Sequence, residues 1–137
     1  MSVKINPILA EAVPPGIYTL SSRARASTIV QAVERRGWRC FYLDGRQIED
    51  KAAFLAVSAQ AMRFPSYFGH NWDALEECLT DLAWAPAPGY VLLYDDVARF
   101  ATTHPAEWAT ARAILADAIT HWRALGIPMY VLLRGGE

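Results

Sequence analysis

The chain has 137 residues, of which 53% are hydrophobic and 20% charged, and its formal net charge is −1. This length suits a single domain, and the apolar content excludes a disordered chain. Apolar runs such as 90–94 are far shorter than the roughly 20 residues of a membrane helix, and polar residues interrupt any export signal. We therefore expect a cytoplasmic protein whose two cysteines, Cys40 and Cys78, are reduced and partly buried.

Charge is distributed unevenly along the chain. Residues 1–63 contain nine Lys/Arg and five Asp/Glu, whereas residues 64–100 contain one basic residue, Arg99, and six acidic residues. An acidic central block predicts a cationic partner and argues against nucleic acid at that surface. The basic segment 1–63 leaves a contact with nucleic acid open elsewhere on the molecule.

The N-terminal third is expected to supply one strand and one helix. Residues 1–15 run into a Pro-Pro-Gly turn and are predicted to form an arm before the domain. Residues 17–20 are typical of a short strand, and the serines at 21–22 can cap a helix that stops at Gly37. The nearly continuous apolar run 38–43 predicts a central strand, which carries Cys40.

Helices and strands alternate along the rest of the chain. Asp50 can cap a helix that ends at Phe64-Pro65, and Asn71 is placed to cap a second helix running to about Leu82. The remaining predicted elements are a strand at 90–94, a long helix from Pro105 to Gly126 and a strand at 129–133. Strands separated by helices favour a parallel sheet. We therefore predict a small α/β fold with three to four parallel strands in the order βαβααβαβ.

Few residues are arranged for catalysis, cofactor binding or metal binding. No strand-to-helix turn carries the glycine spacing of a phosphate-binding loop. His70 and Asp73 stand three residues apart at a predicted helix start, but no second His-carboxylate pair completes a metal site. Cys78 follows three carboxylates whose negative field disfavours a thiolate, so we expect a packed thiol. The sequence therefore predicts neither a cofactor nor a metal.

The helix that begins after Asn71 is the most informative element. At about 100° per residue, its apolar side chains gather on one side: Trp72, Leu75, Cys78, Leu79 and Leu82. Asp73 and Glu77 share the opposite side, flanked by Glu76 and Asp81, with no Lys or Arg between them. Each like-charged pair four residues apart costs about 0.2–0.5 kcal/mol. This pattern leaves two interpretations open, a solvated surface and a binding face.

An aromatic loop precedes this helix. Tyr67 and Phe68 are adjacent in a short segment between Pro65 and Gly69. We expect one ring to anchor the loop to the core and the other to be exposed, the alternative being that both are buried. Exposed aromatic side chains beside a charged face are typical of protein interfaces.

The run FPSYFGHNWDALEECLTDL, residues 64–82, closely resembles the signature of the barstar family of intracellular ribonuclease inhibitors. The shared pattern is Pro, an aromatic pair, Gly, any residue, Asn, any residue, Asp-Ala-Leu, two positions and a small or Cys residue before Leu. A weaker resemblance extends from Trp38 to Leu133. It implies a single barstar-like domain at 16–137, with a core at 38–134 and an added strand and helix at 16–37.

In that family, the loop and helix plug the nuclease active site, with carboxylates in place of substrate phosphates. The resemblance therefore implies a partner-binding surface made of Tyr67, Phe68, Asn71, Asp73, Glu76 and Glu77. Tyr67 matches the loop aromatic that packs on the nuclease, and Asp73 matches the acidic position of the motif. Glu77 falls where the principal inhibitory Asp of the family stands, which keeps the charge on a longer side chain.

The sequence departs from the family pattern at two places. Glu76 occupies the position of a family Trp. A further acidic contact expected on the last long helix falls near His121 or Trp122, where this chain has no carboxylate. These departures bear on which nuclease is the target.

The sequence thus predicts a stoichiometric protein inhibitor of a small basic ribonuclease or nuclease toxin. We expect this immunity protein to be a monomer when free, with no chemistry, cofactor or membrane contact of its own. One alternative is a small α/β enzyme with a concave site at Asp95 and Asp96, at the carboxyl end of strand 90–94, with His70 as acid-base partner. Another is a barstar-like adaptor that does not bind a nuclease.

Overall fold

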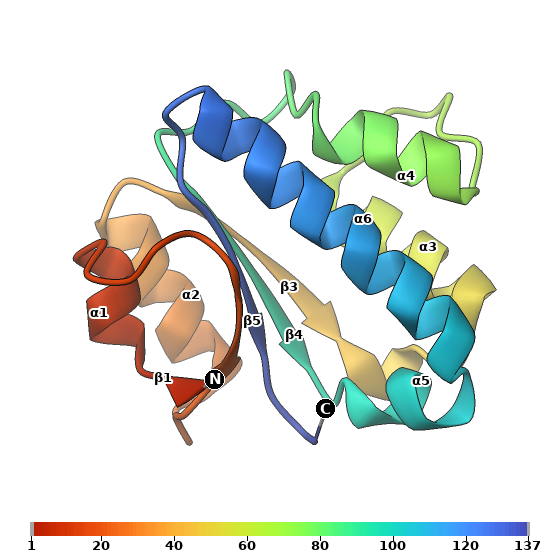
Figure 1. The fold of residues 1–137 in the computed structure, drawn as a ribbon, viewed down its shortest axis with the longest axis horizontal. Helices are drawn as coiled ribbons and strands as arrows, with labels where there is room; N and C mark the ends of the chain where they lie inside the picture. Colours follow the sequence, from red (N-terminus) through yellow and green to blue (C-terminus); the bar gives the residue numbers. More distant parts are fainter. Residues whose placement is uncertain (1, 137) are drawn as a thin grey trace.

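Five parallel strands form one sheet in the order β1-β2-β5-β4-β3 (Figure 1). The structure, a computed structural model, describes residues 2–136. The strands are β1 (Ser2–Val3), β2 (Ile17–Leu20), β3 (Arg39–Asp44), β4 (Tyr90–Asp95) and β5 (Met129–Leu133). The α/β class and the parallel sheet are confirmed, whereas the predicted three to four strands are too few.

Helices cover both faces of the sheet, with α1 and α2 on one face and α3, α4 and α6 on the other (Figure 1). The helices are α1 (Ile5–Leu9), α2 (Ala26–Arg35), α3 (Lys51–Met62), α4 (Trp72–Leu79), α5 (Ala98–Thr103) and α6 (Pro105–Ala124). A 3-10 turn, η1 (Gly45–Gln47), follows β3. Within residues 2–136, no helix combines the length and the apolar character needed to cross a membrane.

An apolar layer on each face of the sheet explains why the sequences of the central strands are continuously hydrophobic. In β4, Val91 and Leu93 pack in the layer that contains Ile29 and Val33 of α2. Alternate residues of β4 point into the larger layer under α3, α4 and α6. A parallel sheet buried on both faces needs apolar residues at every strand position, because successive side chains point to opposite faces.

The prediction of an N-terminal arm outside the domain is wrong for the described residues. Val3 of β1 pairs with Leu20 of β2, and Ile8 of α1 is fully buried. Pro7 does not break α1 because a proline in the first turn removes no intrahelical hydrogen bond. This segment is therefore part of the domain.

Three other details differ from the prediction. Strand β3 lies at the edge of the sheet, so Cys40 is on an edge strand and is only partly buried. Helix α2 begins after Arg25, because the Ser22 hydroxyl accepts from the backbone N–H of Ala24 and closes a turn before the helix. The short helix α5, between β4 and α6, was not predicted.

Candidate functional site

Asn71 fixes the start of α4. Its Oδ1 atom accepts a hydrogen bond from the backbone N–H of Ala74 at 2.8 Å, which caps the helix as predicted. Its Nδ2 atom donates to the carbonyl of Gly69 at 3.4 Å, which ties the helix start to the preceding loop. Within the free protein, the Asn71 side chain therefore positions the loop relative to α4.

Of the aromatic pair, Phe68 anchors the loop to the core and Tyr67 is exposed. The Tyr67 side chain is 75% exposed, whereas Phe68 is only 7% exposed. The Phe68 ring packs against Phe64 at a centroid distance of 4.9 Å and against His70 at 4.7 Å. The Phe68 ring therefore holds the loop on the core and leaves little of its own surface exposed for a partner.

Four carboxylates form an exposed acidic row on and just after α4. They are Asp73, Glu76, Glu77 and Asp81. None of the four has an ion-pair partner among the residues that the structure describes. Negative charge in such a row is uncompensated within the free protein, which is the arrangement that attracts a cationic partner.

Helix α4 ends at Leu79, three residues earlier than predicted. The Thr80 hydroxyl donates to the carbonyl of Glu76 at 2.8 Å, and the backbone N–H groups of Asp81 and Leu82 both donate to the carbonyl of Cys78. Leu82 then adopts a left-handed conformation with φ of 47°. Asp81 therefore lies beyond the last turn, so only Asp73 and Glu77 are a like-charged pair four residues apart within the helix.

The inner side of α4 is held on a rigid support. Leu75, Cys78 and Leu79 are buried, and the indole N–H of Trp122 in α6 donates to the Leu79 carbonyl at 2.8 Å. Trp122 thus anchors α4. It lies near the position at which the barstar resemblance implies an acidic contact residue. Burial, with the charges of Asp81 and Glu77, raises the pKa of Cys78 and keeps its thiol protonated.

Sequence reasoning missed Lys51 as a neighbour of the acidic row. Its ammonium group lies 4.9 Å from the centroid of the Trp72 ring, at the start of α4. The Trp72 ring also packs against Phe54 of α3. Lys51 comes directly after the cap of α3, and no local pattern in the sequence predicts that α3 and α4 begin side by side.

The carboxylate of Asp95 is already occupied by other side chains. Arg134 donates to its two oxygens at 2.6 and 2.9 Å, and the Tyr42 hydroxyl donates at 3.1 Å. Arg134 also donates to the carbonyls of Ser22 and Ala24. Burial and the charge of Asp95 raise the pKa of Tyr42 to about 12, so the hydroxyl remains a donor at neutral pH.

A shallow hollow of about 310 Å³ does lie at the site of the predicted enzyme alternative. It is lined by Ser22, Arg23, Ala24, Asp95, Asp96, Arg134 and Gly135. His70, the acid-base partner of that alternative, does not line it. Without His70, and with Asp95 paired to Arg134, the hollow retains only Asp96 of the three groups that the alternative required in an unpaired form within the described residues.

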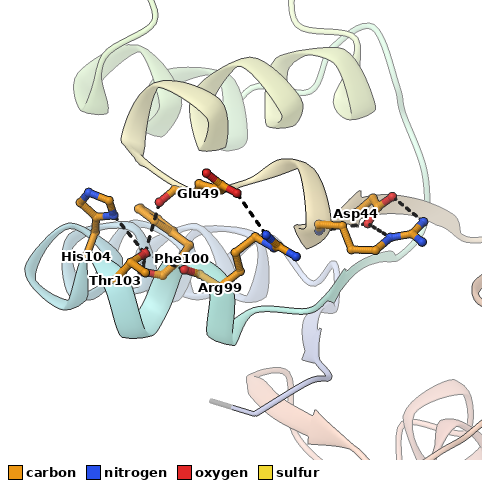
Figure 2. A network of polar contacts seen from close by, with 7 residues as sticks. Asp44, Glu49, Arg99, Phe100, Thr103 and His104 are labelled. Carbon is orange, nitrogen blue, oxygen red and sulfur yellow. Dashed lines mark hydrogen bonds and ion pairs between the residues drawn. The ribbon is translucent and has the colours of Figure 1, made fainter.

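Charged residues at the neighbouring end of β3 also neutralise one another. Figure 2 shows Arg99 paired with Glu49 at 3.1 Å, and the Thr103 hydroxyl donating to the Glu49 carbonyl at 3.3 Å. Arg46 pairs with Asp44 at 2.9 Å, and its hydrogen bonds lower the pKa of Asp44. The two contacts of Glu49 join the segment after β3 to α5. The charged residues here are therefore paired, whereas the carboxylates of the acidic row have no ion-pair partner among residues 2–136.

Comparisons with known proteins bear on the family and the fold. A family model described as Barstar (barnase inhibitor) matches residues 38–134. No curated protein matches the chain. Among solved structures, the Aeropyrum pernix ORC2 protein (ADPNP-ADP complexes) is similar, with a TM-score of 0.53 and 14% sequence identity. The match covers 97% of this chain and 38% of that chain, and at this identity it shows a shared fold alone.

Proposed function

Because this chain belongs to the barstar family, we propose that it is a stoichiometric protein inhibitor of a small basic ribonuclease, active in the cytoplasm. The observation that carries the proposal is the acidic row of α4, whose four carboxylates have no cationic partner within the described residues. A ribonuclease active site holds substrate phosphates with Arg, Lys and His side chains. A row of carboxylates can occupy the same cations without being a substrate.

Each residue of the site has a distinct role in this proposal. Glu77 and Asp73, one turn apart on α4, would pair with the cations of the nuclease, and Glu76 would extend the contact. Tyr67, which is 75% exposed in the loop before α4, would pack on the nuclease surface as an aromatic anchor. Asn71 would act mainly by holding the loop and the helix in register.

Preorganisation supports tight binding at this surface. The loop is fixed by the buried Phe68 ring, and α4 is fixed by the bond from Trp122 to the Leu79 carbonyl. Because these contacts exist in the free protein, little conformational entropy is lost when the partner binds. The enzyme alternative has no comparable support, because Asp95 is paired with Arg134.

The proposal is tested by capture of the partner with a matched control. Wild-type protein and the Asp73→Asn/Glu77→Gln variant are immobilised separately and exposed to extracts and secreted proteins of the source organism. Both substitutions are isosteric and lie at exposed positions, so we expect the two proteins to have equal melting temperatures. Equal values would show that the variant is folded.

We expect a small basic protein with ribonuclease activity on the wild-type support and not on the variant support. Retention of a protein without nuclease activity would favour the adaptor alternative instead. Equal retention of the ribonuclease on both supports would show that the interface is not on α4.

A further inference from the structure

The basic N-terminal segment, residues 1–37, is not used by the proposed inhibitory surface. Residues 1–37, which precede the segment matched by the family model, contain five Lys/Arg and two Asp/Glu. Of these basic residues, Lys4 follows β1, while Arg23 and Arg25 follow β2. Since the carboxyl ends of parallel strands meet at one edge of a sheet, these residues gather at the edge where α/β proteins bind ligands.

A hollow of about 440 Å³ opens at this edge beside the ends of β1 and β2. Its lining consists of Lys4, Ile5, Asn6, Ser21, Ser22 and Arg23. The lining contains two cations, one amide and two hydroxyls, and it contains no carboxylate. This composition suits an anion that offers several acceptor oxygens.

The donors of this hollow are free in the described structure. The side chains of Lys4, Asn6, Ser21 and Arg23 make no hydrogen bond or ion pair within residues 2–136. The Ser22 hydroxyl accepts from the backbone N–H of Ala24 at 3.1 Å, and its own proton remains available to donate. A ligand therefore need not displace an existing contact.

The start of α2 carries cations and no acidic residue of its own. Arg23 and Arg25 stand immediately before this helix, whose first turn contains no acidic residue and has no side-chain cap. Cations at the positive end of a helix dipole are destabilising. A bound anion would offset this repulsion, whereas a site for a cation would worsen it.

A second hollow shares part of its lining with the first and differs in its chemistry. It is the 310 Å³ hollow at Asp95 and Asp96, and it shares Ser22 and Arg23 with the first. Asp95 is paired with Arg134, but Asp96 is exposed and has no ion pair within the described residues. A free carboxylate repels phosphate and accepts hydrogen bonds from hydroxyl groups.

We propose that the two adjoining hollows together bind a small sugar phosphate, with its phosphate group on Lys4 and Arg23 and a sugar hydroxyl on Asp96. The phosphate end of the ligand would contact Lys4 and Arg23, the two cations that line the first hollow. The hydroxylated end would contact Asp96, the hydrogen-bond acceptor in the second hollow. The site lies on the N-terminal segment and is separate from the acidic row of α4 (Figure 1).

Isothermal titration calorimetry on the full chain tests this site with three probes: ribose 5-phosphate, inorganic phosphate and ribose. We expect ribose 5-phosphate to bind more tightly than phosphate, and ribose to bind weakest. The Lys4→Gln/Arg23→Gln variant should lose about tenfold in affinity for both phosphate-bearing probes. Arg35→Gln, which removes an exposed cation from the other end of α2, is the matched control and should bind as the wild type does.

The Asp96→Gly variant separates the two ends of the ligand. Glycine accepts the left-handed backbone at this position, where φ is 54°, so the fold should be kept. Affinity for inorganic phosphate should stay or rise when this negative charge is removed, while the preference for ribose 5-phosphate should disappear. The proposal would be overturned if Asp96→Gly kept the preference for ribose 5-phosphate over inorganic phosphate. It would also be overturned if Arg35→Gln lost as much affinity as the Lys4→Gln/Arg23→Gln variant, or if the wild type did not bind ribose 5-phosphate at millimolar concentration.

Discussion

Tyr67 and Phe68 are adjacent in the sequence and their side chains lie on opposite sides of the loop, one 75% and the other 7% exposed. The buried ring packs on Phe64 and His70, and the exposed Tyr67 ring belongs to the loop that leads into α4. One residue therefore determines the shape of the loop and the next is available to a partner.

This relationship predicts opposite effects for two alanine substitutions. Tyr67→Ala should leave the free energy of unfolding within about 0.5 kcal/mol of wild type and weaken ribonuclease binding by about tenfold or more. Phe68→Ala should lower the free energy of unfolding by about 3–5 kcal/mol, because it opens a cavity under the loop. Urea denaturation and a binding titration of each variant check the pair. Equal effects of both substitutions on stability would contradict this division.

Elements with strong local signals could be predicted from the sequence. Asp50 and Asn71 were expected to cap helices, and each accepts the hydrogen bond of a cap, from Ala53 and Ala74 respectively. The last strand was placed at 129–133, as observed. These features depend on residues near one another in the chain, so local propensity and periodicity were sufficient.

Features that depend on distant contacts could not be predicted. β1 has two residues and α1 has five, and neither is long enough to show a periodic pattern. The pairing of Asp95 with Arg134 joins residues 39 positions apart, and it occupies one of the two carboxylates on which the enzyme alternative depended. The outward and inward directions of Tyr67 and Phe68 also required the fold, since both residues are aromatic.

Arg134 is expected to hold the N-terminal segment to the sheet. It joins Asp95 to the carbonyls of Ser22 and Ala24, and both partners of the ion pair are only 16% exposed. Arg134→Met should lower the free energy of unfolding by about 2–4 kcal/mol, because the Asp95 charge loses its partner. Amide hydrogen exchange should accelerate first in residues 21–25.

The matched control for that variant is Arg99→Met. Arg99 and Glu49 form an exposed ion pair, which typically contributes less than about 1 kcal/mol. Urea denaturation of both variants makes the comparison. If Arg99→Met and Arg134→Met lowered the free energy of unfolding equally, the contacts of Arg134 with Asp95 and with the carbonyls of Ser22 and Ala24 would contribute no more than an exposed ion pair.

The two cysteines are expected to be unreactive and dispensable for inhibition. Burial, with a smaller effect from Glu34, raises the pKa of Cys40 to about 12, and burial raises the pKa of Cys78. Because the thiolate is the reactive form, alkylation by iodoacetamide should be slow in the folded protein between pH 7 and 9 and fast in urea. The Cys40→Ala/Cys78→Ala variant should keep inhibition and lose a few kcal/mol of stability at most. Loss of inhibition with an intact fold would assign a role to a thiol.

Salt should slow the association of the protein with its ribonuclease. The Debye length falls from about 30 Å to a few ångströms as ionic strength rises from about 10 to 500 mM. If the unpaired carboxylates of α4 steer the encounter, the association rate constant measured by stopped flow should fall steeply and the dissociation rate constant should change little. An association rate that does not depend on salt would contradict steering by the acidic row.

Glu77 is central to the proposed function because it lies one turn after Asp73 on the exposed side of α4 and has no ion-pair partner in the described residues. In a complex, its removal would leave cations of the nuclease buried without a counter-charge, which costs about 2–5 kcal/mol. In the free protein, its removal also relieves a like-charged contact with Asp73. Glu77→Ala should therefore weaken binding by about two orders of magnitude or more without lowering the free energy of unfolding.

The most direct test is to titrate the activity of the source organism's small basic ribonuclease with wild-type protein and with Glu77→Ala. The account predicts that activity falls linearly to zero at one equivalent of wild-type protein, and that Glu77→Ala needs about a hundredfold higher concentration for the same effect. Full activity at several equivalents of wild-type protein, or equal inhibition by both proteins, would contradict it.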